Sequence, residues 1–360
     1  VVISALGLTK KLNAVTYSQQ SVDVDQMTEA RDINITNMLA GKVAGLQVTN
    51  TGQPGSSSRV VIRGESSLTG NNQPLWVVDG VPIANDMGDT RGDNLDYGNG
   101  AADLNPDDIA SIVVLKGPNA AALYGSEAAN GAILITTKRG SGKDKNLGIS
   151  FNENLTMLTI TAFPAYQNIY GEGQYGRMVT NNNQIVGSTG AIRMGTFGSS
   201  WGAPMLGQPY LLFNGDVSTY SPQPGNVAAL YKNSFTNISN LAISKSDAVS
   251  SFRLSYTLTK SNDVLENQNL NLKHNLSLST TRKIGTHINI DTRFQYIHDN
   301  TKNRTYRNLD PNSPMAAYVY LPRSANMAGF IPWVGPDGNA INLNTYSNTE
   351  NPHRSLYENK

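Results

Sequence analysis

The sequence contains no cysteine among its 360 residues. This absence excludes disulfide bonds, thiolate metal sites and a cysteine nucleophile. Histidine is scarce, and His274, His287 and His298 fall on expected strands without the spacing of metal ligands. The G-x-S-x-G, H-E-x-x-H and His-centred triad patterns are also missing. We therefore expect no catalytic residue, no metal site and no enzyme activity.

The sequence has no excess of charge of one sign and no long hydrophobic run. The 28 Lys and Arg residues nearly balance the 27 Asp and Glu residues. A nucleic-acid partner is therefore not expected, because the basic surface that it requires is missing. The longest apolar runs, such as IVVL at 112–115, fall far short of the ~20 residues of a membrane helix.

A phosphate-binding loop is likewise missing. The stretch LKGPNAAALYGSEAANGAILITTKRG, residues 115–140, has glycines but not the G-x-x-x-x-G-K-[ST] spacing. The segment GEGQYG, residues 171–176, fits G-x-G-x-x-G, but no strand precedes it and no helix follows it. We expect no nucleotide and no other cofactor. Residues 115–140 instead indicate a strand, a short helix and a second strand, with glycines at the corners.

Residues 1 to about 140 indicate an α/β unit. A short helix is expected after Asn34, which is a suitable N-cap, with Ile35, Met38 and Leu39 on one face and Gly45 at its end. Asn105 before Pro106 predicts another helix start. Strands are expected around these helices, including 74–83 and 111–115.

After about residue 146 the pattern becomes strict alternation of apolar and polar residues. In 251–260 the apolar positions are Phe252, Leu254, Tyr256 and Leu258, with serine, threonine and Arg253 between them. The same pattern recurs at 270–279 and 286–298. Two weaker strands are expected at 147–161 and 234–245, and Glu153 interrupts the apolar face of the first.

Strand length and loop asymmetry favour a membrane barrel. Ten residues at ~3.3 Å each give ~33 Å, which at a tilt of ~40° spans the ~25 Å apolar band of an outer-membrane barrel. The connections at 246–250 and 281–285 are short, whereas 162–233 and 299–360 are long. A soluble antiparallel sandwich also alternates, and it stays open as the other interpretation.

Several motifs resemble one family. NMLAGKVAGLQV, VVIRGESSL, PLWVVDGVPI, VLKGP, ALYG, NGAI and SSWGAPMLG occur in the order found in TonB-dependent outer-membrane transporters of the SusC/RagA type. The resemblance implies a membrane β-barrel of about 22 antiparallel strands with an α/β plug in its lumen. Residues 1–10 would be the TonB-box region, 11–140 the plug, and 147–360 roughly the first five barrel strands with long extracellular loops.

The resemblance also implies a function and partners. We expect TonB-dependent import of an oligosaccharide or a peptide across the outer membrane of a Gram-negative bacterium. TonB with its inner-membrane energising complex, a SusD-like surface lipoprotein and outer-membrane lipid are the expected partners. Two alternatives stay open: a siderophore or vitamin receptor, and a barrel that acts as a structural component of an outer-membrane assembly.

Candidate residues follow from the matching motifs, and each has a structural alternative. Strand pairing with TonB would use Val1, Val2, Ile3 and Ser4, although β-branched residues suit any first strand. The plug motif residues have a signalling or a purely structural role: Arg63, Gly64, Asp79, Gly80, Lys116 and Gly117. Asp79 also suits a simple turn. The candidates for facing substrate are Asp86, Asp89, Arg91, Asp93, Asp96, Trp201 and Tyr210. The structural alternative is a solvated loop for the first five and packing within an outer loop for Trp201 and Tyr210.

Overall fold

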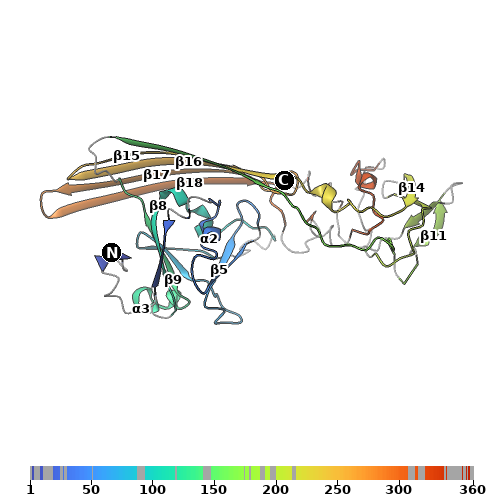
Figure 1. Ribbon diagram of the computed structural model, residues 1–360, viewed down its shortest axis with the longest axis horizontal. Coiled ribbons are helices and arrows are strands. Elements are labelled where there is room, and N and C mark those ends of the chain that lie inside the picture. The colour runs from blue at the N-terminus through green and yellow to red at the C-terminus, as the bar shows by residue number, and fades with distance from the viewer. Residues whose placement is uncertain are drawn as a thin grey trace.

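A front domain (residues 19–140) and a long sheet (between residues 148 and 302) form the left part of the molecule in Figure 1, and a loop region (within 159–233 and 321–356) extends beyond the sheet. The computed structural model describes residues 2–3, 9–10, 19–24, 27, 31–50, 52–86, 94–117, 120–140, 147–173, 175–177, 180–186, 191–194, 200–212, 216–306, 313–314, 321–335, 338, 351, 354 and 356.

The front domain is built on a five-stranded sheet with an apolar core. Its strands in spatial order are β3 (Gln19–Val22), β8 (Ile109–Leu115), β9 (Ala132–Thr137), β6 (Leu75–Val78) and β7 (Val81–Ile83). β6 and β9 run parallel, and the other pairs are antiparallel. A hairpin of β4 (Leu46–Asn50) and β5 (Ser58–Ile62) packs beside it. Trp76, Ile112 and Ile133 are completely buried in this core.

The short helix α2 (Ile35–Met38) begins as the sequence predicts. The side chain of Asn34 accepts a hydrogen bond from the amide of Thr36 at 3.0 Å, and Ile35, Met38 and Leu39 are buried. The prediction that Gly45 ends the helix is wrong, because the helix stops at Met38. None of the described helices is long and apolar enough to cross a membrane.

The glycine-rich stretch after β8 is a tight corner, as expected. α3 (Ala121–Tyr124) ends at Gly125, whose φ of 75° favours glycine. Gly131 has a φ of 100°, and a Cβ there would lie 2.7 Å from the carbonyl oxygen of Leu115. The chain can therefore return to β9 directly beside β8 only with glycine at this point. Short 3-10 helices complete the front domain: η3 (Gly100–Asp103), η4 (Pro106–Asp108) and η6 (Ser126–Ala128).

The long sheet has five antiparallel strands of 11 to 15 residues. They are β10 (Gly148–Leu158), β15 (Ser234–Ser246), β16 (Ser250–Ser261), β17 (Leu270–Ile284) and β18 (Ile288–Lys302), in this spatial order. The predicted turn at 281–285 is wrong, because β17 continues to Ile284 and the turn comes after it. All five strands exceed the usual ~5–6 residues of soluble proteins.

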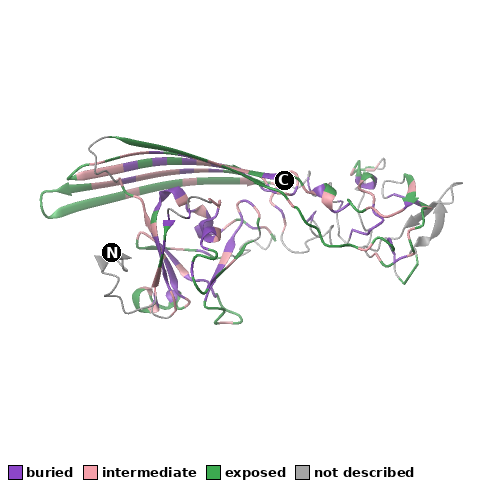
Figure 2. Cartoon of the chain, viewed as in Figure 1, coloured by how far each residue is buried: buried purple, intermediate pink, exposed green. Residues whose placement is uncertain are grey.

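In a soluble sandwich the apolar face of a sheet is buried and the polar face is exposed, but the long sheet shows the reverse. On β16, Leu254 and Tyr256 are 37% and 40% exposed, whereas Ser255 and Thr257 are 1% and 2% exposed. Figure 2 shows this alternation of buried and exposed positions along the sheet, with the front domain against the inner face. The apolar face therefore points outward and the polar face inward, which is the arrangement of a membrane barrel.

The outward apolar band crosses the strands diagonally. On the loop side the band ends at Tyr296 on β18 and at Met157 on β10. Tyr296 lies in the same cross-strand row as Phe151, so the end of the band shifts by six residues over the four steps from β18 to β10. With a rise of ~3.3 Å per residue and a strand spacing of ~4.8 Å, this shift corresponds to a strand tilt of about 45°. This value agrees with the tilt of membrane barrels.

The loop region contains a small sheet that the sequence pattern does not predict. Its strands are β11 (Thr180–Val186), β12 (Ala191–Met194), β13 (Gln208–Leu211) and β14 (Val217–Tyr220), and the 3-10 helices η7 (Ala228–Leu230) and η8 (Met327–Phe330) lie nearby. In Figure 1 this region lies at the opposite end from the short turns of the long sheet. Long loops at one end and short turns at the other match the sequence expectation.

Candidate functional site

The candidate site is the contact between the front domain and the inner face of the long sheet. The contacts that cross it are hydrogen bonds and ion pairs. Three groups of contacts carry it, one each at the 3-10 helix η4, at the β6–β7 turn and at the segment 96–103. They join residues that are more than 140 positions apart in the sequence.

The first group surrounds η4. Arg253 of β16 donates to the carboxylate of Asp108 at 2.8 Å, and both side chains are at most 10% exposed. The hydroxyl of Ser255 also donates to this carboxylate. Asn105, which caps η4 as predicted, donates in addition to the hydroxyl of Thr257 at 2.7 Å. The helix cap is thus also a bridge to the sheet.

Asp107, the neighbour of Asp108, turns back toward the front domain. It forms an ion pair with Arg31 at 2.9 Å, and its side chain is 4% exposed. Burial raises the pKa of the Asp107 carboxyl, while the Arg31 guanidinium opposes that rise. The η4 turn therefore presents one carboxylate to each side of the interface.

The second group surrounds the β6–β7 turn. Asp79 and Gly80 both have positive φ, 50° and 91°, which suits a two-residue hairpin turn. The Asp79 carboxylate accepts from the amide and hydroxyl of Thr137 and pairs with Arg293 of β18 at 2.8 Å. Asp79 therefore occupies the turn that its sequence context suits, and its carboxylate also contacts the long sheet.

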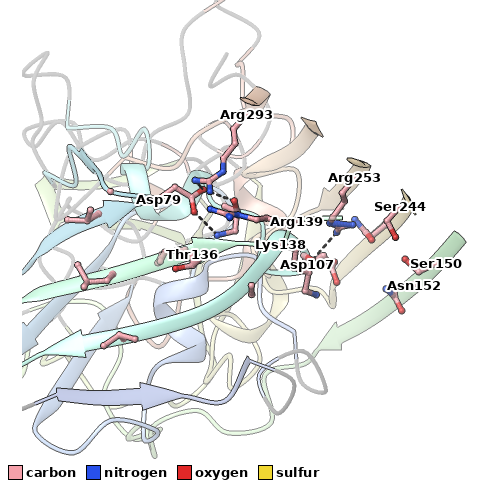
Figure 3. Close-up of a pocket in the computed structure, with 18 of the residues that line it drawn as sticks. Asp79, Asp107, Thr136, Lys138, Arg139, Ser150, Asn152, Ser244, Arg253 and Arg293 are labelled. Carbon is pink, nitrogen blue, oxygen red and sulfur yellow. Dashed lines mark hydrogen bonds and ion pairs between the residues drawn. The ribbon is translucent and has the colours of Figure 1, made fainter. Parts of the chain in front are cut away.

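This ion pair belongs to a chain of alternating charges. Arg293 also reaches Asp291 of β18 at 3.3 Å, and Asp291 pairs with Arg139 of the front domain at 2.9 Å. Figure 3 shows Asp79, Arg139 and Arg293 close together, with Arg253 and Asp107 at the other side of the same space. That space is a cavity of about 720 Å³ between β8, β9 and the strands of the long sheet.

The third group fixes the far end of the front domain. Lys273 of β17 is 4% exposed and donates to the carbonyl oxygen of Ala102 at 2.5 Å. Arg304, which follows β18, donates to the carbonyl oxygens of Gly55 and Asp96 and lies over the ring of Tyr97. Burial lowers the pKa of Arg304. Lys273 also lies 3.7 Å from the carboxylate of Asp103, so the two cations contact backbone carbonyls and, at Lys273, a carboxylate.

Several buried side-chain atoms at the interface have no hydrogen-bond partner within the described part of the chain, including atoms of Asn275, Ser279 and Asp107. Buried polar groups are normally satisfied by protein groups or by ordered water. The contacts across the interface are therefore polar, and the interface is not an extension of the apolar core.

A second polar centre lies in the loop region, where residues 171–173 and Gly176 contact residues 200–204. The amide of Gly202 donates to the carbonyl oxygen of Gly171, and the hydroxyl of Tyr220 donates to that of Glu172. Glu172 is 2% exposed, and burial raises the pKa of its carboxyl well above the usual value. The motif that resembles a dinucleotide-binding fingerprint is thus part of a packed loop.

The structure separates the other predicted residues. Arg63 and Gly64 have φ of 61° and 86°, and the backbone amide of Arg63 donates to Gly45 inside the front domain. Lys116 donates to the side chain of Gln20 at 2.7 Å, and Gly117 has a φ of 84°. These residues, at the face remote from the sheet contacts described above, hold the front domain together.

The predicted substrate-facing residues are divided as well. Asp96 is buried and accepts from the amide and hydroxyl of Ser57, while Asp86 is exposed and accepts from Asn71. Tyr210 is 1% exposed and donates to the carbonyl oxygen of Ser324, so it faces the interior of the loop region; Trp201 is 66% exposed. Asp89, Arg91, Asp93, Val1 and Ser4 lie outside the described residues.

Sequence reasoning missed the cations of the long sheet that face inward. Arg253, Lys273 and Arg293 all lie on the polar face of strands in which polar and apolar residues alternate. That position is itself a signal, because a cation on the inner face of a barrel strand needs a partner in the lumen. The identity of each partner needs the three-dimensional fold.

Comparison with known proteins identifies the two parts. The family described as the TonB-dependent Receptor Plug Domain matches residues 11–132. The TonB-dependent receptor SusC of Bacteroides thetaiotaomicron is 35% identical over 202 residues, which are 56% of this chain and 19% of SusC. The chain therefore resembles SusC/RagA-type TonB-dependent receptors over the plug and part of the barrel.

Two further similarities agree with this identification. TonB-dependent receptor P26 of Formosa agariphila is 38% identical over 143 residues, which are 39% of this chain and 13% of P26. The RagAB peptide importer in its open-open state superposes with a TM-score of 0.56 at 21% identity, covering 84% of this chain and 32% of the RagAB chain. This structural likeness shows the fold: the front domain is the plug, and the long sheet is part of the barrel wall. The chain spans about a fifth or less of the two curated receptors.

Proposed function

We propose that this SusC/RagA-type receptor imports an oligomeric nutrient across the outer membrane of a Gram-negative bacterium. The observation that carries the proposal is the polar contact between plug and wall. Water can replace each partner in such a contact, so opening it costs less than exposing an apolar core of the same size. Import through a plugged barrel requires this separation.

We propose that residues Val1–Ser4 couple the plug to TonB by strand addition. β1 (Val2–Ile3) pairs antiparallel with β2 (Thr9–Lys10), so one edge of β1 is occupied and the other edge can accept a strand from a partner. In Figure 1, β1 lies toward the end of the long sheet that carries the short turns. That end would face the periplasm, where TonB reaches the receptor.

The cargo class and the lid are also part of the proposal. The similarity to SusC and to a peptide importer supports an oligosaccharide or a peptide as cargo and a SusD-like lipoprotein at the outer mouth. Trp201 is exposed beside Tyr170, with ring centroids 6.5 Å apart, and such rings can stack on a sugar or on an aromatic side chain.

Growth of a deletion strain on defined glycans, peptides and iron chelates tests the cargo class. We expect the loss of growth on one oligomer and normal growth on iron chelates. Loss only on iron chelates would favour a siderophore receptor, and loss on none of these, with a damaged envelope, would favour a structural role.

Single substitutions in β1 test the coupling. Val2→Pro removes a backbone donor from the strand and should abolish growth on the oligomer. Val2→Thr keeps a β-branched residue and should support normal growth at equal surface display. Equal growth of both variants would show that strand addition by this segment is not needed.

A further inference from the structure

The outward face of the barrel wall changes its character near the loop region. Two neighbouring cross-strand rows are apolar on β16, β17 and β18: Leu254, Leu278 and Phe294 form one, and Tyr256, Leu276 and Tyr296 form the other. The next row toward the loops contains His274 and His298, and Lys260 follows one row further on β16. Lys302 is the last residue of β18 and occupies an outward position.

The aromatic and imidazole rings at this border form a ladder across three strands. The hydroxyl of Tyr256 and the Nδ1 atom of His274 are 2.8 Å apart. The ring of His274 lies 6.2 Å from that of Tyr256 and 6.3 Å from that of His298. On β18 the ladder marks the end of the apolar band, because His298 follows Tyr296 on the outward face. Lipid headgroups begin at such a border.

The charge at this border is positive. Lys260 and Lys302 are exposed, and neither forms an ion pair with a carboxylate among the residues that the structure describes. Asp299 is on the inner face of β18, where it accepts from Asn271. Glu153 is on the outward face, but it lies two strands and one row away from Lys260. This offset corresponds to a backbone distance of about 12 Å.

We propose that Lys260, His274, His298 and Lys302 bind the phosphate-bearing headgroup of a membrane lipid whose acyl chains lie on the apolar rows beside them. The two ammonium groups supply the attraction, and the imidazole N–H groups supply further donors to phosphate oxygens. Leu270, Leu272 and Tyr296 supply apolar surface between and below these donors. The proposal rests on the membrane location in the proposed function but not on the imported cargo.

The test uses the full-length receptor reconstituted with equal amounts of phosphatidylglycerol and phosphatidylcholine. Native mass spectrometry then counts the lipids that stay bound after detergent transfer. We expect the receptor to retain phosphatidylglycerol preferentially. Because it loses two of the cations that attract an anionic headgroup, the Lys260→Gln, Lys302→Gln double variant should bind it at least about tenfold more weakly at low salt.

Two controls keep the result interpretable. Lys42→Gln removes an exposed lysine of the plug, away from the lipid-facing surface, and should leave lipid retention unchanged. Inorganic phosphate at millimolar concentration should not displace the bound lipid. Equal retention of phosphatidylglycerol by the double variant, no preference over phosphatidylcholine, or displacement by phosphate alone would each overturn the lipid site. Nutrient uptake, measured separately, decides the proposed function.

Discussion

The plug makes two kinds of contact, one inside itself and one with the barrel wall. Inside, β-branched and aromatic side chains such as Trp76, Ile112 and Ile133 exclude water completely. Toward the wall, Arg253 pairs with Asp108, and Asn105 donates a hydrogen bond to Thr257. The difference indicates that the plug is held together as one unit but is attached to the wall by contacts that water can replace.

The largest expected effect belongs to the plug core. Ile112→Ala should lower the free energy of unfolding of the plug by about 2–5 kcal/mol, because it leaves a cavity among buried side chains. Hydrogen exchange of the β8 and β9 amides would measure this. Leu68→Ala, at a fully exposed position, is the matched control and should leave exchange unchanged. Similar exchange in both variants would contradict a dry core.

The buried ion pair at η4 should have the next largest effect. Arg253→Ala leaves the Asp108 carboxylate without its guanidinium partner and should weaken attachment of the plug by about 3 kcal/mol. We expect the plug to separate from the wall at lower urea concentration while its β8 amides stay protected. Arg282→Ala, at an exposed position on β17, should change neither quantity. Simultaneous loss of attachment and core protection would show that the two contacts are not independent.

The ion pair at the β6–β7 turn should contribute less. Arg293 is 26% exposed, so solvent screens its attraction to Asp79, and their coupling energy should be about 1 kcal/mol or less. A double-mutant cycle with Arg293→Ala and Asp79→Asn measures it, since asparagine also tolerates the positive φ at this turn. A coupling above that of the η4 pair would reverse the expected order.

The loop region should respond to pH through Glu172. Burial raises the pKa of this carboxyl in the folded state, so its contribution is fully present below the unfolded value near 4.5 and is lost as the pH rises through the folded-state pKa. Proteolysis of the loop region should therefore be slower at pH 5 than at pH 8. Glu172→Gln should reduce this difference, whereas Glu127→Gln, at an exposed position, should not. An unchanged pH dependence in Glu172→Gln would exclude this carboxyl as its source.

The sequence predicts local features better than it predicts their partners. The alternation in 251–260 predicts the outward face of β16, and Asn34 and Asn105 are correctly predicted caps, because strand period and capping depend on neighbouring residues. The contact between Asp108 and Arg253 spans 145 positions, and no local pattern encodes it. Most of the interface was therefore not predictable.

The loop region was the least predictable part. Its small sheet has no apolar alternation, because its strands are short and pack on irregular neighbours such as the segment around Ser324. The sequence leaves Tyr210 as a candidate either for facing substrate or for packing within a loop, and its hydroxyl donates inside the loop region. Aromatic composition alone does not say whether a loop residue points outward.

The separation of plug and wall can be tested by tethering them. Asn105→Cys with Thr257→Cys joins the plug to β16 at two side chains that already touch, in a sequence without cysteine. Asn240→Cys with Thr257→Cys joins two neighbouring wall strands and is the control. Uptake of the growth-supporting oligomer is then measured in both variants before and after reduction. We predict that the oxidised plug–wall pair blocks uptake, that reduction restores it, and that the control imports normally; normal uptake by the fully oxidised plug–wall variant would contradict the account.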